Sequence, residues 1–235
     1  MIKLYKGDCL VEMKNIADKS VDMILCDLPY GITDCDWDKA LPFDDLWSEY
    51  KRVIKDNGAI VLFAKQPFTS KLIMSNLKMY KYNLIWKKDN HDNPLNSKKR
   101  FLNITEDIVI FYKKQCVYNP QGLIPYNKVV KQGGGKSLVM RSDRKPEVFQ
   151  EFTNYPKNIL DFKRDFPMVH PTQKPVALLE YLINTFTNER ALVLDNCMGS
   201  GSTGVAAMNL GRDFIGIELT DKYYNIAKER MHYND

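Results

Sequence analysis

The sequence predicts an α/β protein with a doubly wound, mostly parallel sheet and an inserted region. Two observations lead to this prediction. Short apolar runs alternate with segments of helical periodicity along most of the 235 residues, and that alternation is typical of a parallel sheet covered by helices. The periodicity then fails between residues 113 and 168, a stretch too long for an ordinary loop.

The N-terminal half supplies the first strands and helices. Apolar or aromatic runs predict strands, and these are 3–6, 21–26, 59–64, 82–86 and 107–112. Apolar residues at helical spacing predict helices, and these are 10–17, 43–55 and 67–78. The helix at 43–55 is expected to stop at Asn57-Gly58, and Pro67 is favoured at the start of the next one. The last two strands are expected side by side near one edge.

Regular structure is expected again from Pro175, which opens a helix to about residue 186. Apolar runs at 191–194 and 214–217 predict two strands, each followed by an acid. A helix to about residue 210 separates them. The last helix is amphipathic, and its candidate buried residues are Tyr224, Ile226, Ala227 and Met231.

The composition argues against several classes of protein. The five cysteines are odd in number and form no CxxC pair, and the three histidines are dispersed, so we expect neither a disulfide framework nor a metal site. No segment approaches the ~18 apolar residues of a membrane span. The N-terminus has no apolar signal-peptide core. These features indicate a cytoplasmic protein without a membrane partner.

An acid, a rigid turn and an aromatic ring come together after the predicted strand at 21–26. Because Pro29 cannot continue a central strand, the chain leaves the sheet at Asp27-Leu28-Pro29-Tyr30. Ligands bind at the carboxyl ends of strands in open α/β sheets, which makes this turn a candidate site. A plain surface turn is the alternative, since Asp and Pro are common turn formers.

A glycine-rich loop follows the strand at 191–194. Gly199, Gly201 and Gly204 match GxGxxG between a strand and a helix, a pattern found with dinucleotides and other adenosyl cofactors. Asp195 immediately precedes this loop. Like charges repel, so a carboxylate there disfavours a pyrophosphate and favours a sulfonium cation.

Four acids follow predicted strands, and they are Asp8, Asp27, Asp195 and Glu218. On a parallel sheet they would converge on one edge. Asp195 suits the positively charged amino-acid end of S-adenosylmethionine, Glu218 its ribose hydroxyls and Asp8 its adenine amino group. Each acid could instead cap a turn or helix. As a set they favour S-adenosylmethionine over NAD.

Three motifs in this order resemble those of the DNA amino-methyltransferases. They are DLPYG at 27–31, HPTQKP at 170–175 and DNCMGSGSTG at 195–204. With the catalytic motif first and the cofactor loop last, the order resembles the β class of that family, whose Rossmann-like methyltransferase fold has a circularly permuted motif order. GDCL at 7–10 is similar to the family's adenine-pocket segment.

The resemblance implies a division of the chain. Residues 1–112 would form the catalytic half of the methyltransferase domain, 113–168 the inserted target-recognition region and 169–235 the cofactor-binding half. The implied cofactor-binding residues are Asp8, Cys9, Asp27, Thr172, Gln173, Lys174, Asp195, Gly199, Gly201, Ser202 and Glu218. The segment around Lys174 could instead be a linker into a helix, and Ser202 could cap the helix after the loop.

The implied chemistry is methylation of the adenine N6 amine. An acid at position 27 resembles adenine-N6 enzymes, whereas cytosine-N4 enzymes more often have Ser there. Asp27 and the Leu28 carbonyl would each accept one N6–H, and Pro29 would stiffen the turn. Tyr30 would stack on the base after it flips out of the duplex. The family usually has Pro where this chain has Leu28, but Leu retains the carbonyl.

The cations between residues 81 and 164 are interleaved with aromatic and Asn residues, a mixture that suits phosphate contacts and base stacking. The net charge of +5 is compatible with a polyanionic partner. The candidate DNA contacts are Lys98, Lys99, Arg100, Arg141, Arg144 and Lys145. For each, a solvated surface position is the alternative.

We therefore predict a site-specific adenine-N6 methyltransferase that acts on double-stranded DNA, in a bacterial or phage-infected cell and associated with the nucleoid. The resemblance also suggests a homodimer and a cognate restriction endonuclease. Cytosine N4, RNA or a protein amide nitrogen could be the methyl acceptor instead. A nucleic-acid-binding protein of the same fold with weak turnover is an alternative of another class.

Overall fold

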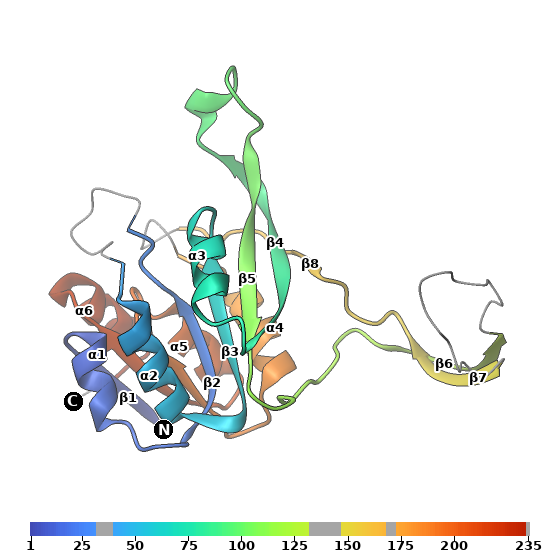
Figure 1. The fold of residues 1–235 in the computed structure, drawn as a ribbon, viewed down its shortest axis with the longest axis horizontal. Coiled ribbons are helices and arrows are strands. Elements are labelled where there is room, and N and C mark those ends of the chain that lie inside the picture. Colours follow the sequence, from blue (N-terminus) through green and yellow to red (C-terminus); the bar gives the residue numbers. More distant parts are fainter. Residues whose placement is uncertain (32–39, 132–146, 168–172, 234–235) are drawn as a thin grey trace. The chain divides into compact units, whose positions relative to one another are not determined.

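The computed structural model describes residues 1–31, 40–131, 147–167 and 173–233. Its contacts divide into two compact units, one of Met1–Asn119 with Asn158–Asp235 and one of Pro120–Lys157. The first unit contains an eight-stranded sheet with helices (Figure 1), and the second contains a two-stranded sheet. The candidate functional residues that the structure describes all belong to the first unit.

Parallel strands form most of the main sheet, whose order is β1-β10-β9-β2-β3-β5-β4-β8. The first five are parallel neighbours, and these are β1 (Ile2–Lys6), β10 (Asp213–Glu218), β9 (Leu192–Asp195), β2 (Val21–Asp27) and β3 (Ile54–Ala64). β5 (Asn103–Phe111) runs antiparallel between β3 and β4 (Tyr80–Asp92), and β8 (Ile159–Asp161) lies parallel to β4 at the edge. The predicted doubly wound, mostly parallel sheet is therefore confirmed.

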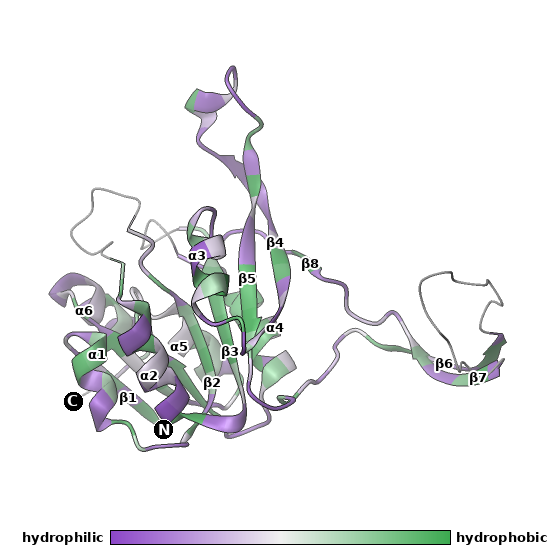
Figure 2. Ribbon diagram, viewed as in Figure 1, coloured by the Kyte–Doolittle hydropathy of each residue, from purple (hydrophilic) through white to green (hydrophobic). Residues whose placement is uncertain are grey.

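Helices cover both faces of this sheet. They are α1 (Cys9–Glu12) with the 3-10 turn η1 (Met13–Asn15), α2 (Phe43–Val53), α3 (Phe68–Ser75), α4 (Val176–Phe186), α5 (Ser202–Asn209) and α6 (Asp221–Arg230). Residues of α4, α5 and α6 pack with Leu25 and Phe63, whereas residues of α1, α2 and α3 pack with Ile24 and Leu62. Successive strand residues point to opposite faces, so strands covered on both faces are apolar throughout. Figure 2 shows this in the apolar colouring of most of β2 and of the second half of β3.

The predicted end of α2 at Asn57-Gly58 is wrong, because α2 ends at Val53 and β3 begins at Ile54. The Asn-Gly pair lies in an irregular part of β3, where the pairing with β2 shifts register. A Cβ on Gly58 would come within 2.8 Å of the Asp22 carbonyl oxygen. The glycine therefore permits a close approach of two strands and does not mark a helix end.

The buried stripe of α6 also differs in part from the prediction. Ala227 and Met231 are buried as predicted, but Tyr223 is the third buried residue, while Tyr224 and Ile226 are half-buried. Residues 223, 227 and 231 are four apart and so lie on one side of a helix. That side packs against the glycine loop, since a Cβ on Gly201 would lie 2.9 Å from the Ala227 Cβ.

Strands β4 and β5 extend past their neighbours as a long hairpin (Figure 1). Ala64, at the carboxyl end of β3, pairs with Asp107, so residues 103–106 of β5 lie beyond that end. The hairpin closes through residues 93–102, which include the 3-10 turn η2 (Pro94–Asn96). The two strands lie side by side near one sheet edge as predicted, but both are longer than predicted.

The second unit consists mainly of β6 (Ile124–Lys131) paired antiparallel with β7 (Glu147–Thr153). Most of the side chains of these two strands are exposed. The predicted insert at 113–168 spans this unit and also β8, which belongs to the main sheet. Among the described helices, none has the length and apolar character to cross a membrane.

Candidate active site at the carboxyl ends of the strands

The carboxyl ends of β1, β10, β9 and β2 meet at one edge of the sheet, because these strands are parallel neighbours. Lys6 pairs with Glu218, and Gly216 pairs with Asp195, so the strands end nearly level. The predicted acids follow or end these strands, and they are Asp8, Asp27, Asp195 and Glu218. Their predicted convergence on one edge is therefore confirmed.

Asp27 is the last residue of β2, and two donors hold its carboxylate. The Tyr30 hydroxyl donates to Oδ1 at 2.6 Å, and the Lys174 ammonium donates to Oδ2 at 2.6 Å. The same Lys174 Nζ lies 2.8 Å from Oε1 of Glu106 on β5. Residues from β2, β5 and the segment before α4 thus form one buried cluster. Two predicted residues, Asp27 and Lys174, come together here from sites 147 positions apart.

Further ion pairs extend this cluster toward the β4–β5 hairpin. Lys88 Nζ lies 2.9 Å from Glu106 Oε2 and 3.2 Å from Asp92 Oδ2. Lys65 Nζ, just after β3, lies 2.5 Å from Asp92 Oδ2. Together with Asp27 and Lys174, these residues form a row of ion pairs in which three carboxylates alternate with three ammonium groups. Its formal charge is zero, which limits the cost of burying these groups.

The pKa values in this cluster follow from burial and from the alternating charges. Burial raises the pKa of Asp27, and the carboxylate of Glu106 adds to that rise against the attraction of Lys174. Burial acts against the charge of Lys174, but the two carboxylates outweigh it and raise the Lys174 pKa. Burial is likewise outweighed at Glu106, whose pKa is lowered by Lys174 and Lys88. Lys174 therefore stays protonated, while Asp27 takes up a proton more readily than an ordinary aspartate.

Tyr30 has a second role that the sequence did not predict. Its ring stacks on Phe68 with centroids 4.8 Å apart, and Phe68 in turn packs on Phe43 at 5.8 Å. Its hydroxyl reaches Asp27, as described above. Stacking of Tyr30 on a substrate base stays a prediction. Phe68 and Trp86 are both buried, and the Trp86 indole N–H donates to the Phe162 carbonyl at 2.9 Å, so both serve core packing.

Leu28 directs its side chain into the apolar layer between the sheet and the helices α2 and α3, and it is only 3% exposed. The side chain at this position therefore contributes to packing. The role predicted for its backbone carbonyl requires no contribution from the side chain and stays a prediction.

The glycine loop is tied to the end of β10. Glu218 Oε2 accepts the Gly199 N–H at 3.0 Å, and its Oε1 accepts from the Thr220 N–H and hydroxyl. Gly199 has φ +52° and Gly201 φ +79°, backbone conformations that L side chains rarely adopt. These glycines thus let the loop turn sharply beside two strand ends.

The alternative in which Ser202 caps the helix is wrong, and its contact with the cofactor stays a prediction. Helix α5 begins at Ser202 itself, and Gly201 occupies the N-cap position without a side chain. The Ser202 hydroxyl instead accepts from Arg230 Nη1 at 3.0 Å. A Cβ on Gly204 would meet the Met231 sulfur and lie 2.8 Å from the Phe214 ring. Because α5 packs closely against α6 and β10, position 204 has no space for a side chain.

Asp195 is buried beneath this loop and is only 3% exposed. Its Oδ1 accepts the Cys197 N–H at 3.1 Å. Burial raises the pKa of Asp195 to about 6, against hydrogen bonds from the Thr203 side chain and the Cys197 amide. Its carboxylate thus titrates closer to neutrality than an exposed aspartate does.

Asp8 caps helix α1, since its Oδ1 accepts the N–H groups of Leu10 at 2.8 Å and Val11 at 3.4 Å. The cap interpretation of Asp8 is thus confirmed for this oxygen, and contact with an adenine stays a prediction. Cys9 is buried beside Cys197, whose hydrogen bond lowers the pKa of the Cys9 thiol.

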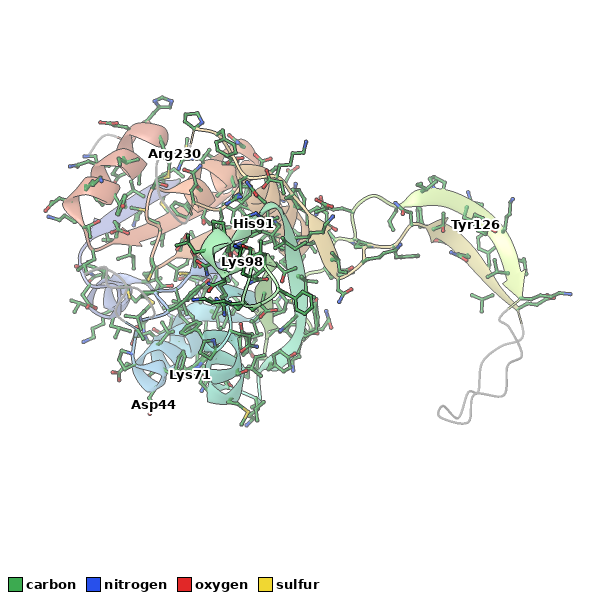
Figure 3. All side chains as sticks on the ribbon, turned by 90° about the horizontal axis from the view of Figure 1, so that it is seen from above. Asp44, Lys71, His91, Lys98, Tyr126 and Arg230 are labelled. Atoms are coloured by element: carbon green, nitrogen blue, oxygen red, sulfur yellow. The ribbon has the colours of Figure 1, made fainter. Side chains whose placement is uncertain are left out.

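The remaining predicted residues divide by position. Gln173 is half-buried next to Lys174, and Thr172 lies outside the described residues. Lys98, Lys99 and Arg100 are exposed on the β4–β5 hairpin, where Figure 3 labels Lys98. The other candidate DNA contacts lie outside the described residues, and they are Arg141, Arg144 and Lys145. Within the described ranges, no cluster of His, Cys, Asp and Glu is arranged to hold a metal ion.

Glu106 and Lys88 are functional candidates that the sequence reasoning missed. Glu106 lies two residues before the buried Ile108, and Lys88 lies two residues after the buried Trp86. Residues two apart in a strand share a face. The sequence signal for both residues was a charged side chain on the same strand face as buried apolar ones. Such a pattern indicates a buried charge that requires a partner.

Comparison with known proteins identifies the family. A DNA methylase family model covering N6 and N4 enzymes matches residues 21–229. DNA adenine methyltransferase YhdJ of Escherichia coli (strain K12) is 31% identical over an alignment of 255 residues. The alignment covers 98% of this chain and 84% of that protein. The crystal structure of the M1.HpyAVI–SAM complex is 28% identical with a TM-score of 0.69, covering 99% of this chain and 100% of the other.

A third comparison supports the fold. The cytosine-N4-specific PvuII DNA methyltransferase is 16% identical with a TM-score of 0.68, covering 100% of this chain and 87% of the other. The alternation of strands and helices, the acids at the strand ends and these matches agree, and the predicted DNA amino-methyltransferase resemblance is confirmed. The chain belongs to the N6/N4 DNA methylase family.

Proposed function

We propose that the protein is a DNA methyltransferase that uses S-adenosylmethionine to methylate adenine at N6. The observation that carries the proposal is the placement of Asp27. It ends a central strand, two donors orient it, and it shares its edge of the sheet with the acids suited to the cofactor. The family and its adenine-methylating relative support the same activity.

The residues at this edge suit a positively charged cofactor. Asp195 and Glu218 are both buried at the ends of adjacent parallel strands, beside a tight glycine turn. A pyrophosphate would face these carboxylates, whereas a sulfonium and an ammonium group would be attracted by them. The M1.HpyAVI relative is described in complex with SAM, which agrees with this sign of charge.

When bound, S-adenosylmethionine supplies an electrophilic methyl group. We assign Asp195 to its amino-acid end and Glu218 to its ribose hydroxyls, because a carboxylate can accept two hydroxyl hydrogen bonds side by side. The segment at Asp8 and Cys9 would border the adenine. The glycine turn lets the backbone lie close to the cofactor without an intervening side chain.

Asp27 orients the amine that receives the methyl group. A carboxylate oxygen has two lone pairs, so an oxygen that accepts from Tyr30 or Lys174 can also accept one adenine N6–H. The Leu28 carbonyl accepts the other N6–H. These two acceptors hold the amine so that its lone pair points away from the ring plane, and the preorganised donors keep Asp27 in place.

The methylated amine carries a surplus proton, and Asp27 is suited to receive it. Burial raises the pKa of Asp27, so its carboxylate is a better proton acceptor than an exposed one. Lys174 keeps its own proton because two carboxylates stabilise it. Lys174 therefore acts as a fixed positive charge, and the proton transfer belongs to Asp27.

Incubation of unmethylated plasmid DNA with labelled S-adenosylmethionine, followed by digestion to nucleosides, tests the proposal. We expect label in N6-methyladenine. Label in N4-methylcytosine would instead support cytosine-N4 methylation, which the family model also covers. Absence of label from the DNA nucleosides would contradict the proposal.

Double-stranded DNA is the substrate that this proposal requires, and Lys98, Lys99 and Arg100 are its proposed contacts in the described part of the chain. The predicted homodimer, the predicted cognate endonuclease and the predicted cytoplasmic location stay predictions. Sedimentation of the purified protein with and without DNA tests the first of them.

A further inference from the structure

The β4–β5 hairpin projects from the edge of the sheet that carries the candidate active site. β5 pairs with β3 at Ala64 and Asp107, and its residues 103–106 continue past the carboxyl end of β3. Glu106, at this crossing point, contacts Lys174, which contacts Asp27. The base of the hairpin therefore lies beside the candidate catalytic acid, and Figure 1 shows the hairpin extending beyond the other strands of the sheet.

Residues 93–102, which we name the hairpin tip, combine exposed apolar side chains with positive charge. Phe101 is 100% exposed and Leu95 is 93% exposed. Lys98, Lys99 and Arg100 lie between them, and the tip contains no acid. A fully exposed aromatic ring contributes no hydrophobic stabilisation to the fold. Its position beside three cations therefore indicates a partner that is polyanionic outside and apolar inside.

Ion pairs brace the hairpin where it leaves the sheet. Lys65 and Lys88 both contact Asp92, as described above. On the other side, Lys87 Nζ lies 2.7 Å from Asp161 Oδ2, and Arg164 Nε lies 3.3 Å from Asp89 Oδ1. Neighbours on both sides thus contact the base of the hairpin, and the less exposed pairs around Asp92 restrain it most.

We propose that the hairpin tip enters duplex DNA and that Phe101, supported by Leu95, stacks into the gap left by the extruded target base. This inference rests on the proposed action on DNA. A strand rises ~3.4 Å per residue, so Phe101 can lie up to about 17 Å from Glu106. The major groove is about 8.5 Å deep and admits a two-stranded ribbon, so the tip can reach the base stack while the target base reaches Asp27.

The positive charge of the hairpin tip favours duplex DNA as its partner. Lys98, Lys99 and Arg100 neutralise phosphates and position the tip, and their contribution depends on salt. Phe101 offers a ring face that any base can stack on, so its contribution is independent of sequence. Apolar side chains that enter between bases are a known means of opening a duplex. Base opening at the tip would deliver an unpaired adenine to the acid beside it.

The test compares Phe101→Ala with the native protein on two duplexes. The methylated sequence is first read from plasmid DNA that the native protein has modified. One duplex contains this sequence intact, and the other has an abasic site opposite the target base, which removes the pairing that must be broken. We expect F101A to slow methylation of the intact duplex on the order of 10- to 100-fold, and to act on the abasic duplex within about threefold of the native rate.

Three controls isolate the tip. Phe101→Trp keeps a stacking ring and should restore the native rate. Leu77→Ala removes a side chain that is also exposed but precedes β4 at the opposite end of the strand, and it should change nothing. Thermal melting of F101A should match that of the native protein, because Phe101 is fully exposed. Equal native and F101A rates on the intact duplex, or equal slowing on both duplexes, would overturn the proposal.

Measurements of DNA affinity test this inference separately from the proposed function, because they do not depend on methyl transfer. Alanine at Lys98, Lys99 and Arg100 should reduce the slope of log affinity against log salt by about one per cation removed. If cytosine rather than adenine is methylated, the proposed function fails, and the duplex comparison is made at cytosine. If no base is methylated, unchanged duplex affinity in F101A and in the triple variant refutes the inference. Loss of self-association, instead of DNA affinity, would assign the tip to a second copy of the chain.

Discussion

At the scale of single residues, Asp27 lies in a buried site beside a positive neighbour, with a second carboxylate beyond that neighbour. Lys174 Nζ and the Tyr30 hydroxyl each donate to it at 2.6 Å, and Glu106 lies on the far side of Lys174. Lys174 lowers the pKa of Asp27 and Glu106 raises it. In the proposed mechanism Asp27 must be deprotonated to accept an amine proton, so activity should fall as the pH falls through its pKa. Changes at the two neighbours should therefore move the acidic limb of the pH profile in opposite directions.

Lys174→Met should raise the pKa of Asp27, because it removes the nearest positive charge. We expect the acidic limb of kcat/KM to move up by about one pH unit or more. The unpaired carboxylates should also destabilise the fold by about 3–5 kcal/mol. Rates measured between pH 5 and 9 check the first effect, and thermal melting checks the second. Lys174→Arg, which keeps the charge, is the control, and a K174M profile like that of the native protein would refute this account.

Glu106→Gln should have the opposite effect on the acidic limb. The substitution keeps the size of the side chain and removes its negative charge, so the pKa of Asp27 should fall. We expect the limb to move down by about one pH unit. Glu106 is a positioning residue that acts through Lys174, so KM for DNA should stay within about twofold of the native value. A shift in the same direction as that of K174M would contradict the charge order described here.

If Asp195 binds the cofactor as proposed, the affinity for the cofactor should depend on pH. Burial raises its pKa to about 6, and only its deprotonated form attracts a cation. The affinity for S-adenosylmethionine should therefore be full above pH 7 and fall as the pH drops through about 6. Calorimetric titrations from pH 5 to 8 measure this. Asp195→Asn should bind more weakly and lose the dependence, and an affinity of the native protein that stays constant across this range would count against the assignment.

At the scale of elements, the site depends on how closely α5 packs. Gly204 lies against the Phe214 ring of β10 and the Met231 sulfur beyond α6, with no space for a methyl group. The glycine loop and the end of β10 are held together by Glu218, which accepts from Gly199. A displacement of α5 would therefore displace the proposed cofactor residues.

Gly204→Ala should destabilise the protein by about 1–3 kcal/mol, because overpacking forces neighbouring elements apart. Affinity for S-adenosylmethionine should fall as well, while Asp27 stays in its cluster. Melting temperature and calorimetry measure the two effects. Gly211→Ala is a control for the cofactor effect only: its φ of +67° carries a strain that lowers stability, but no atom lies within 4 Å of a Cβ there, so affinity for S-adenosylmethionine should stay native. Native stability in G204A would show that α5 tolerates the extra group.

At the scale of the whole molecule, the sequence predicts the parts whose signal is local. Residues 23–26 of β2 and 59–64 of β3 are buried on both faces and are apolar without interruption, and the order of these strands relative to the helices identifies the fold. Asp27 and Asp195 were found because each directly follows such a run. The acids converge because parallel neighbouring strands end at the same edge.

The parts that the sequence did not predict depend on tertiary contacts. Glu106 is a site residue only because β5 lies beside β3, which brings it to Lys174. β8 has only three residues, too few for a readable period, and it joins the sheet by pairing with β4. Ser202 has the residue type of a cap, but Gly201 takes that place and Arg230 holds the hydroxyl.

The central claim is that Asp27 orients the adenine amine for methylation. The most direct test measures N6-methyladenine formed in plasmid DNA by the native protein and by Asp27→Ala, with the affinity of both for S-adenosylmethionine measured alongside. We predict N6-methyladenine from the native protein and none from D27A, although D27A stays folded and binds the cofactor. Absence of N6-methyladenine from the native product, or its formation by D27A at the native rate, would contradict the claim.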